Sequence, residues 1–83
     1  MSKMKYIIVD NGLYNSVIIF DHIAKHNEMA QKMHAIESVV SAGFVRIFDG
    51  KFECYGRSVS LDIKSRPEDS DYINKFMGVA TDG

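Results

Sequence analysis

The sequence has little of what marks several large classes of protein. Its 83 residues include one cysteine, which excludes an internal disulfide and a zinc site made of several cysteines. Apolar runs such as Val17 to Phe20 are far too short to cross a membrane. Neither a secretory signal nor a transit peptide can be recognised, so we expect a cytoplasmic protein that makes no membrane contact.

An excess of charge of either sign is also missing. Ten basic residues nearly balance eleven acidic ones, and the formal net charge is −1. Domains that bind nucleic acid usually carry a strongly basic surface. The composition therefore argues against nucleic acid as a partner.

Motifs that would indicate catalysis or a cofactor are absent from the sequence. The glycines are isolated, so none belongs to a phosphate-cradling loop, and no nucleophile elbow surrounds a serine or Cys54. His22 and His26 have the spacing of two metal ligands on one helix face, but a metal site needs further ligands. We predict no metal and no cofactor, and binding is favoured over catalysis.

The clearest structural pattern is a β-hairpin over residues 41–63. Asp49-Gly50 suits a two-residue type I′ turn, and this turn fixes the register of the two strands. Side chains alternate across a strand, so one face of the hairpin is entirely apolar. That face contains Val45, Ile47, Phe52 and Cys54. On the other face Arg46 lies opposite Glu53, and such an ion pair contributes about 0.2–1 kcal/mol.

The alternation changes phase at Gly56. The apolar positions after this glycine are odd-numbered, whereas Phe52 and Cys54 are even-numbered. A β-bulge or a tight bend at Gly56 would absorb the extra residue. Bulges often lie beside functional sites because they re-aim side chains. The alternative is that Gly56 simply begins a separate strand.

A second hairpin is predicted for residues 5–20, around Asn11-Gly12. Both of its faces are apolar. One face contains Tyr6, Ile8, Leu13, Val17 and Ile19, and the other contains Ile7, Val9, Tyr14, Ile18 and Phe20. A sheet with one face in water should alternate apolar and polar side chains, so this hairpin should be covered on both faces. In so short a chain, we expect a second copy of the chain to supply the second cover.

Two helices are predicted. The first lies within Asp21–Ala42, with its N-cap at Asn27 or at the start of this range. Its apolar stripe is formed by Met29, Met33, Ile36 and Val40. Gly43 lies where a glycine is expected to end the helix. The second begins at Ser65, which forms a capping box with Glu68, and ends before Gly78.

Together these elements predict an α+β fold. An antiparallel sheet of four to five strands, in the order β-β-α-β-β(-β)-α, carries both helices on one face. We expect residues 1–83 to form a single domain with a loose tail from about residue 79. The other face of the sheet would be exposed and apolar, as is typical of an interaction surface.

A candidate ligand site follows from the phase change at residue 56. Its two arginines would approach each other if the last helix starts beside the bulged strand. Guanidinium and hydroxyl groups suit a carboxylate or phosphate, and an aromatic ring could stack on a base. The site residues are Tyr55, Arg57, Ser58, Ser60 and Arg66. The alternative is an ordinary solvated strand edge.

A candidate interface covers the exposed apolar face of the sheet. Tyrosine, phenylalanine and arginine are enriched in the cores of protein interfaces. The interface residues are Tyr6, Ile8, Val17, Ile19, Phe44, Arg46 and Phe48. We therefore expect a small non-enzymatic binding protein that is homo-oligomeric and sequesters or docks a partner. The alternatives are a binding site for an anionic small molecule or nucleotide, an inhibitor or adaptor that uses the aromatic face, and a small enzyme.

Overall fold

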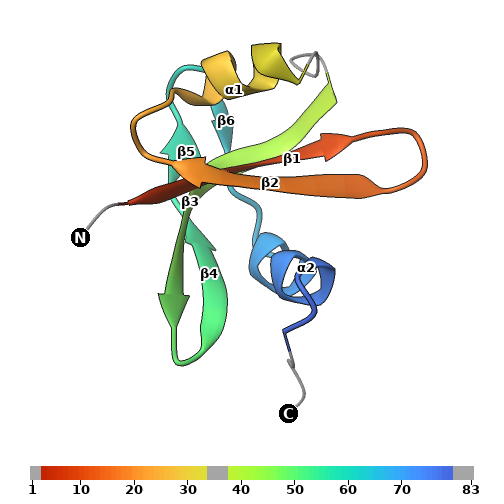
Figure 1. Ribbon diagram of the computed structural model, residues 1–83, viewed down its shortest axis with the longest axis vertical. Coiled ribbons are helices and arrows are strands. Elements are labelled where there is room, and N and C mark those ends of the chain that lie inside the picture. Colours follow the sequence, from red (N-terminus) through yellow and green to blue (C-terminus); the bar gives the residue numbers. More distant parts are fainter. Residues whose placement is uncertain (1–2, 34–37, 80–83) are drawn as a thin grey trace.

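The computed structural model describes residues 3–33 and 38–79, which form an α+β fold (Figure 1). The elements are β1 (Met4–Asp10), β2 (Asn15–Asp21), α1 (His26–Lys32), β3 (Val39–Phe48), β4 (Lys51–Tyr55), β5 (Arg57–Ser58), β6 (Ile63–Lys64) and α2 (Asp69–Phe76). The first four strands form an antiparallel sheet in the order β2-β1-β3-β4, and β5 pairs with β6 in a separate ribbon. The predicted class and the four-stranded antiparallel sheet are confirmed.

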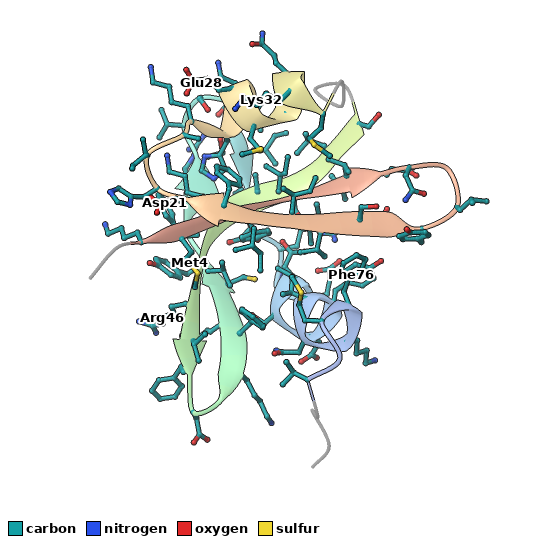
Figure 2. All side chains as sticks on the ribbon, in the orientation of Figure 1. Met4, Asp21, Glu28, Lys32, Arg46 and Phe76 are labelled. Atoms are coloured by element: carbon teal, nitrogen blue, oxygen red, sulfur yellow. The ribbon has the colours of Figure 1, made fainter. Side chains whose placement is uncertain are left out.

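The hairpin of β3 and β4 has the predicted register. Arg46 lies opposite Glu53, and its Nε donates to Glu53 Oε1 at 2.6 Å. Both turn residues have positive φ, as a type I′ turn requires. The burial differs from expectation at Ile47, which is 63% exposed. The hairpin projects beyond the rest of the sheet as an arm, with Arg46 on it, so the predicted burial of Ile47 is wrong (Figure 2).

The hairpin of β1 and β2 closes with a longer loop than predicted. Asp10 lies opposite Asn15, so four residues form the loop. The Asn11 side chain accepts the N–H groups of Leu13 and Tyr14, which satisfies this wider turn. A shift of two residues keeps every strand side chain on its predicted face. Leu13 and Tyr14 lie in the loop and are exposed.

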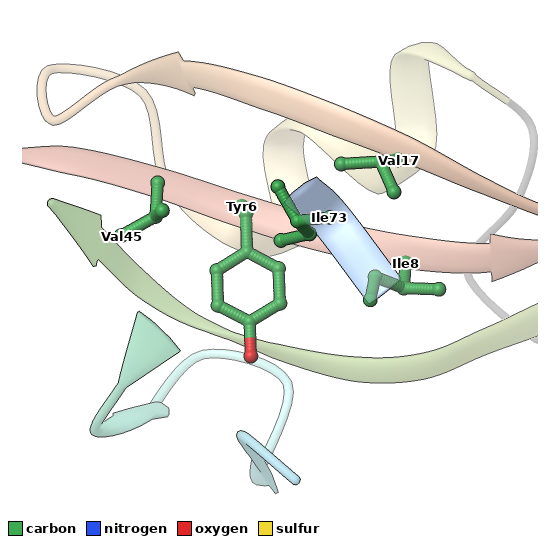
Figure 3. Packing of buried hydrophobic residues seen from close by; sticks show 5 residues of the cluster. All are labelled: Tyr6, Ile8, Val17, Val45 and Ile73. Atoms are coloured by element: carbon green, nitrogen blue, oxygen red, sulfur yellow. The ribbon is translucent and has the colours of Figure 1, made fainter. Parts of the chain in front are cut away.

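Both apolar faces of this hairpin are covered, and the chain itself supplies both covers. On one face Ala30 of α1 packs with Ile7, and the β5–β6 ribbon adds Ile63 nearby. On the other face Ile73 of α2 packs with Tyr6. Figure 3 shows Ile73 in front of the strands and α1 behind them. The expectation that both helices share one face is therefore wrong, because an apolar hairpin needs cover on each side.

The first helix is much shorter than predicted. α1 ends at Lys32, and the chain from Val39 onward forms β3 in the middle of the sheet. Val39 and Val40 are β-branched, as is typical of strands, and Val39 pairs with Val9 of β1. The predicted N-cap is also wrong: Lys25 is the N-cap, and the Glu28 side chain accepts its N–H at 2.9 Å. Ile36 lies outside the described residues.

Gly43, predicted to end that helix, lies inside β3. A Cβ added to Gly43 would lie 2.7 Å from the carbonyl oxygen of Tyr55. The residue is therefore a glycine because the end of β4 passes against the backbone of β3 at this point.

A buried carboxylate anchors the start of α2. Asp69 is fully buried and accepts hydrogen bonds from Tyr6 Oη at 2.5 Å and from Arg66 N and Nε at 2.9 Å each. The predicted capping box at Ser65 does not form, because Glu68 is the N-cap and Ser65 Oγ donates to Gly56 O instead. The helix ends before Gly78, as predicted.

The hydrogen bonds keep Asp69 ionised in the core. Burial by itself would raise the pKa of Asp69, but the bonds from Tyr6 and Arg66 lower it below its ordinary value. Burial, together with the bond to Asp69, raises the pKa of Tyr6, so Tyr6 stays a neutral donor. The charge of Asp69 is balanced by Arg66.

Side chains of α2 also satisfy the outer edge of β4. Asn74 Oδ1 accepts the N–H of Phe52 at 2.8 Å, and Asn74 Nδ2 donates to the carbonyl of Phe52 at 2.9 Å. Ser70 Oγ accepts the N–H of Cys54 at 2.9 Å. Both backbone groups of Phe52 and the N–H of Cys54, which β4 would otherwise offer to a further strand, are therefore engaged.

Replacing the Asp69 carboxylate should destabilise the protein strongly. Asp69→Ala leaves Tyr6 Oη buried without its acceptor and removes the partner of Arg66, so we expect a loss of about 3–5 kcal/mol in the free energy of unfolding. Asp71→Ala, at an exposed site in the same helix turn, is the matched control and should cost under about 1 kcal/mol. Urea unfolding measures both. Equal losses would contradict the anchoring role of Asp69.

Candidate functional site

A pocket of about 480 Å³ lies between β1, the turn before α1 and the β5–β6 ribbon. This volume is within the range of small-ligand sites, roughly 300–1,000 Å³. The lining residues are Lys5, Lys25, His26, Phe44, Arg57, Val59 and Ser60.

The pocket is lined by positive charge. Lys5 comes from β1, Lys25 from the turn before α1, and Arg57 from β5. Within residues 3–33 and 38–79, no carboxylate is among the lining residues. Lys5 Nζ is held in place by donating to the carbonyl of Ala24 at 2.9 Å. Arg57 forms an ion pair with Asp62 on the ribbon loop. In a chain whose net charge is −1, this local gathering of cations is a specific property of the site.

Aromatic rings form the apolar part of the pocket. The ring of His26 meets Phe20 and Phe44 edge-on, with centroid distances of 5.6 and 5.9 Å. Phe44 stacks on Tyr55 with a distance of 5.7 Å between ring centroids, on the face of the β3–β4 hairpin that also carries Arg46. Each of these contacts joins a different pair of elements, so the rings are fixed from several directions.

The protonation state of His26 follows from its surroundings. Burial lowers the pKa of His26, and the nearby charge of Lys5 lowers it further, against the raising effect of Gly43 O. The ring is therefore neutral at pH 7. His26 Nε2 lies 2.8 Å from Gly43 O, a group that can only accept, so the proton is on Nε2 and Nδ1 is left as an acceptor.

A turn at Gly56 places Arg57 in the lining of the pocket. Gly56 has a φ of +73°, and after it the chain leaves the four-stranded sheet and enters β5. The Gly56 carbonyl accepts both the N–H and the hydroxyl of Ser65, which fixes the turn. Of the two alternatives at Gly56, the structure has the separate strand.

Two of the five predicted ligand residues line this pocket, namely Arg57 and Ser60. Ser58 is buried, and its hydroxyl accepts the N–H of Leu61. Tyr55 lies behind Phe44 and outside the lining. Arg66 is not among the lining residues either, because Asp69 and Glu68 hold it at the start of α2.

The remaining lining residues were not predicted as ligand residues. Lys5, Lys25 and His26 are far from Arg57 in the sequence and meet it only through the packing of α1 and the ribbon against the sheet. Val59, one of the odd-numbered apolar positions after Gly56, is exposed in the loop between β5 and β6. No local sequence pattern points to this convergence.

The predicted interface is divided among three environments. Tyr6, Ile8 and Val17 are buried in the chain's own core beneath α2, so they cannot form an exposed interface in this fold (Figure 3). Ile19 is partly buried at the edge of that cluster, and Phe44 lines the pocket. Arg46 and Phe48 are exposed on the arm, where the Arg46 guanidinium lies 5.9 Å from the centre of the Phe48 ring.

Other chemistry in the described residues is limited. Over residues 3–33 and 38–79, no group of three or more histidine, cysteine, aspartate and glutamate side chains could hold a metal ion. In that same part of the chain, the helices are too short or too polar to cross a membrane. Burial raises the pKa of Cys54 to about 11, so the thiol is protonated and weakly nucleophilic at neutral pH.

The burial of neutral His26 should make stability depend on pH. The unfolded chain takes up a proton at an ordinary histidine pKa near 6.5, whereas the folded chain does so only at lower pH. Stability should be full above pH 6.5 and fall below it, by at most about 1.4 kcal/mol per pH unit, until the folded pKa is passed. Urea unfolding at pH 7.5 and 5.5 measures this. His26→Gln should flatten the dependence and His22→Gln should not; an unchanged slope in His26→Gln would contradict the assignment.

Comparison of the chain with models of known protein families, with curated proteins and with solved structures found no match.

Proposed function

We propose that the protein is a non-catalytic binding protein and that its pocket takes a small organic anion. The observation that carries this proposal is the convergence of Lys5, Lys25 and Arg57 on one pocket. Among the described residues no carboxylate lines this pocket, and Asp62 pairs with Arg57 from outside the lining. Cations from separate segments that gather around one pocket favour a negatively charged ligand. A lone surface lysine would not do so.

The lining suggests a ligand with two parts. A phosphate or carboxylate would lie among the cationic groups, and a flat or apolar part would lie against Phe44 and Val59. Ser60 Oγ accepts the N–H of Asn27 at 3.1 Å, and its own hydroxyl proton can go either to Ser58 Oγ at 3.4 Å or to the ligand. A mononucleotide has this combination of groups and suits the volume of the pocket.

Binding is favoured over catalysis by the state of the reactive groups. The only thiol, Cys54, is protonated and is not among the lining residues. His26 Nε2 is engaged with Gly43 O, and among the described residues no hydrogen bond joins Ser60 to His26. A nucleophile activated by a general base needs that bond.

Thermal unfolding with a panel of anions tests the proposal. The panel contains mononucleotides, inorganic phosphate and aromatic carboxylates. A ligand at a hundred times its Kd adds about 2.7 kcal/mol to the stability of the folded state, which gives a clear rise in Tm. Lys25→Ala and Arg57→Ala each remove a charge-assisted contact, so we expect each to raise Kd at least about tenfold.

Lys51→Ala and Lys75→Ala are the matched controls, because each removes one positive charge outside the pocket lining. They should leave Kd within about twofold, since only long-range screened charge is lost. If no anion in the panel raises Tm, or if the controls weaken binding as much as Lys25→Ala does, the pocket is not an anion site.

A second candidate function is the docking of a partner protein on the arm. Ile47 and Phe48 are each 63% exposed there, and Arg46 lies near the rings of both Phe48 and Tyr55. Exposed aromatic and arginine side chains of this kind are enriched at the centres of protein interfaces. An inhibitor or adaptor would use such a surface.

Phe48→Asp tests the arm, because a charge placed in an apolar contact must be desolvated. The expected result is loss of a specific partner that co-purifies in fixed ratio with the wild-type protein from its own host. Lys51→Ala, at the same turn, should keep that partner. Equal recovery with Phe48→Asp would rule out docking through the arm.

A further inference from the structure

The two edge strands of the four-stranded sheet differ in whether their outward backbone groups have hydrogen-bond partners. The edge of β4 is covered by α2, because Asn74 bonds to both backbone groups of Phe52 and Ser70 bonds to the N–H of Cys54. The opposite edge is β2. Edge strands with free N–H and C=O groups are templates for pairing with another strand.

The register shows which groups of β2 face outward. Asn11 N donates to Tyr14 O at 3.1 Å across the loop, and hydrogen-bonded pairs alternate with unbonded ones along an antiparallel ladder. The pairs that bond to β1 therefore include Ile7 with Ile18, and the backbone groups of Val17 and Ile19 point away from β1. The Asn15 carbonyl lies on that outward side and accepts the Tyr72 hydroxyl.

Apart from the Asn15 carbonyl, which Tyr72 occupies, this outward row is open in the part of the chain that the structure describes. No side chain within residues 3–33 and 38–79 makes a hydrogen bond to the backbone of Val17 or Ile19. β2 reads Asn-Ser-Val-Ile-Ile-Phe-Asp and contains no lysine, proline or glycine. Natural edge strands usually carry such residues, which discourage pairing.

We propose that β2 pairs antiparallel with β2 of a second copy of this chain, across a twofold axis at Ile18. Val17 would then lie opposite the partner's Ile19, and the outward N–H and C=O groups of both residues would bond between the copies. The two four-stranded sheets would become one continuous sheet. A twofold axis makes the contact isologous and closed, so it stops at a dimer.

The sequence of β2 is complementary to itself in this register. Asn15 lies opposite the partner's Asp21, so no two like charges face each other, and the Asn15 carbonyl keeps its bond to Tyr72. A second copy thus fits this edge without any change of side chain.

The exposed apolar residues beside β2 give a second argument for a second copy. Leu13 is 92% exposed before β2 begins, and Ile23 is 82% exposed after it ends. Antiparallel pairing brings the start of one β2 beside the end of the other, so each Leu13 would approach the partner's Ile23. Figure 2 shows Asp21 at one end of the strand and Phe76 beneath the other end, so exposed Phe76 would also approach the partner.

The dimer and the anion pocket are separate features. No residue of β2 lines the pocket. The dimer can therefore form whether or not the proposed ligand exists.

Amide hydrogen exchange at several protein concentrations tests the interface. Exchange at Val17 and Ile19 should slow at least about tenfold as sedimentation shows the monomer becoming a dimer, because their N–H groups gain acceptors. Ile18 is the internal control, since its N–H bonds to β1 in either state. A clean monomer at several hundred micromolar would overturn the proposal. So would a dimer in which Val17 and Ile19 still exchange as in the monomer.

A pair of charge variants tests the register. Asn15→Lys places a cation opposite the partner's Asp21, and Asn15→Asp places a like charge there. Each dimer contains this contact twice, so we expect the dimer Kd to fall about 2- to 30-fold with Asn15→Lys and to rise by a similar factor with Asn15→Asp. Gln31→Lys and Gln31→Asp, on exposed α1, reproduce the changes in net charge and should leave Kd within twofold. Equal effects at both positions would overturn the register.

Discussion

The whole fold depends on one strand that is apolar on both faces. Four consecutive side chains of β1, from Tyr6 to Val9, are buried, and successive side chains of a strand point in opposite directions. A chain of 83 residues must therefore place a layer on each side of a thin sheet. α2 forms one layer, and α1 with the β5–β6 ribbon forms the other. The buried charge of Asp69 fixes the first layer, because its hydrogen bonds hold β1 and the start of α2 together.

The pocket is a consequence of how the second layer is made. A seven-residue helix and a short ribbon cannot cover the sheet as closely as one long helix would. The space between them is lined by long cationic side chains, which keep their charged ends near solvent while their stems cover apolar surface. The same arrangement that completes the core thus gathers positive charge beside aromatic rings.

Sequence reasoning succeeded where a local rule was decisive. The Asp49-Gly50 turn and strict alternation specified the register of β3 and β4. The phase change at Gly56 marked the point where the chain leaves the four-stranded sheet and begins β5. Sequence reasoning failed where contacts between residues distant in the sequence determine the secondary structure or the composition of the pocket. The chain from Val39 onward is a strand because β1 and β4 pair with it, although its apolar spacing also suits a helix. Lys5, Lys25 and His26 converge only in the folded chain, so no spacing could have joined them to Arg57.

Because α2 covers both an apolar face of the sheet and the backbone edge of β4, its detachment would expose two aggregation-prone surfaces together. If α2 detaches, the apolar face beneath Ile73 and the backbone edge at Phe52 and Cys54 are uncovered in the same event. A partly unfolded species of this kind exposes both an apolar face and an unpaired strand edge, which together promote ordered aggregation. Aggregation would then be governed by how often α2 detaches from the sheet, and not by the stability of the sheet itself.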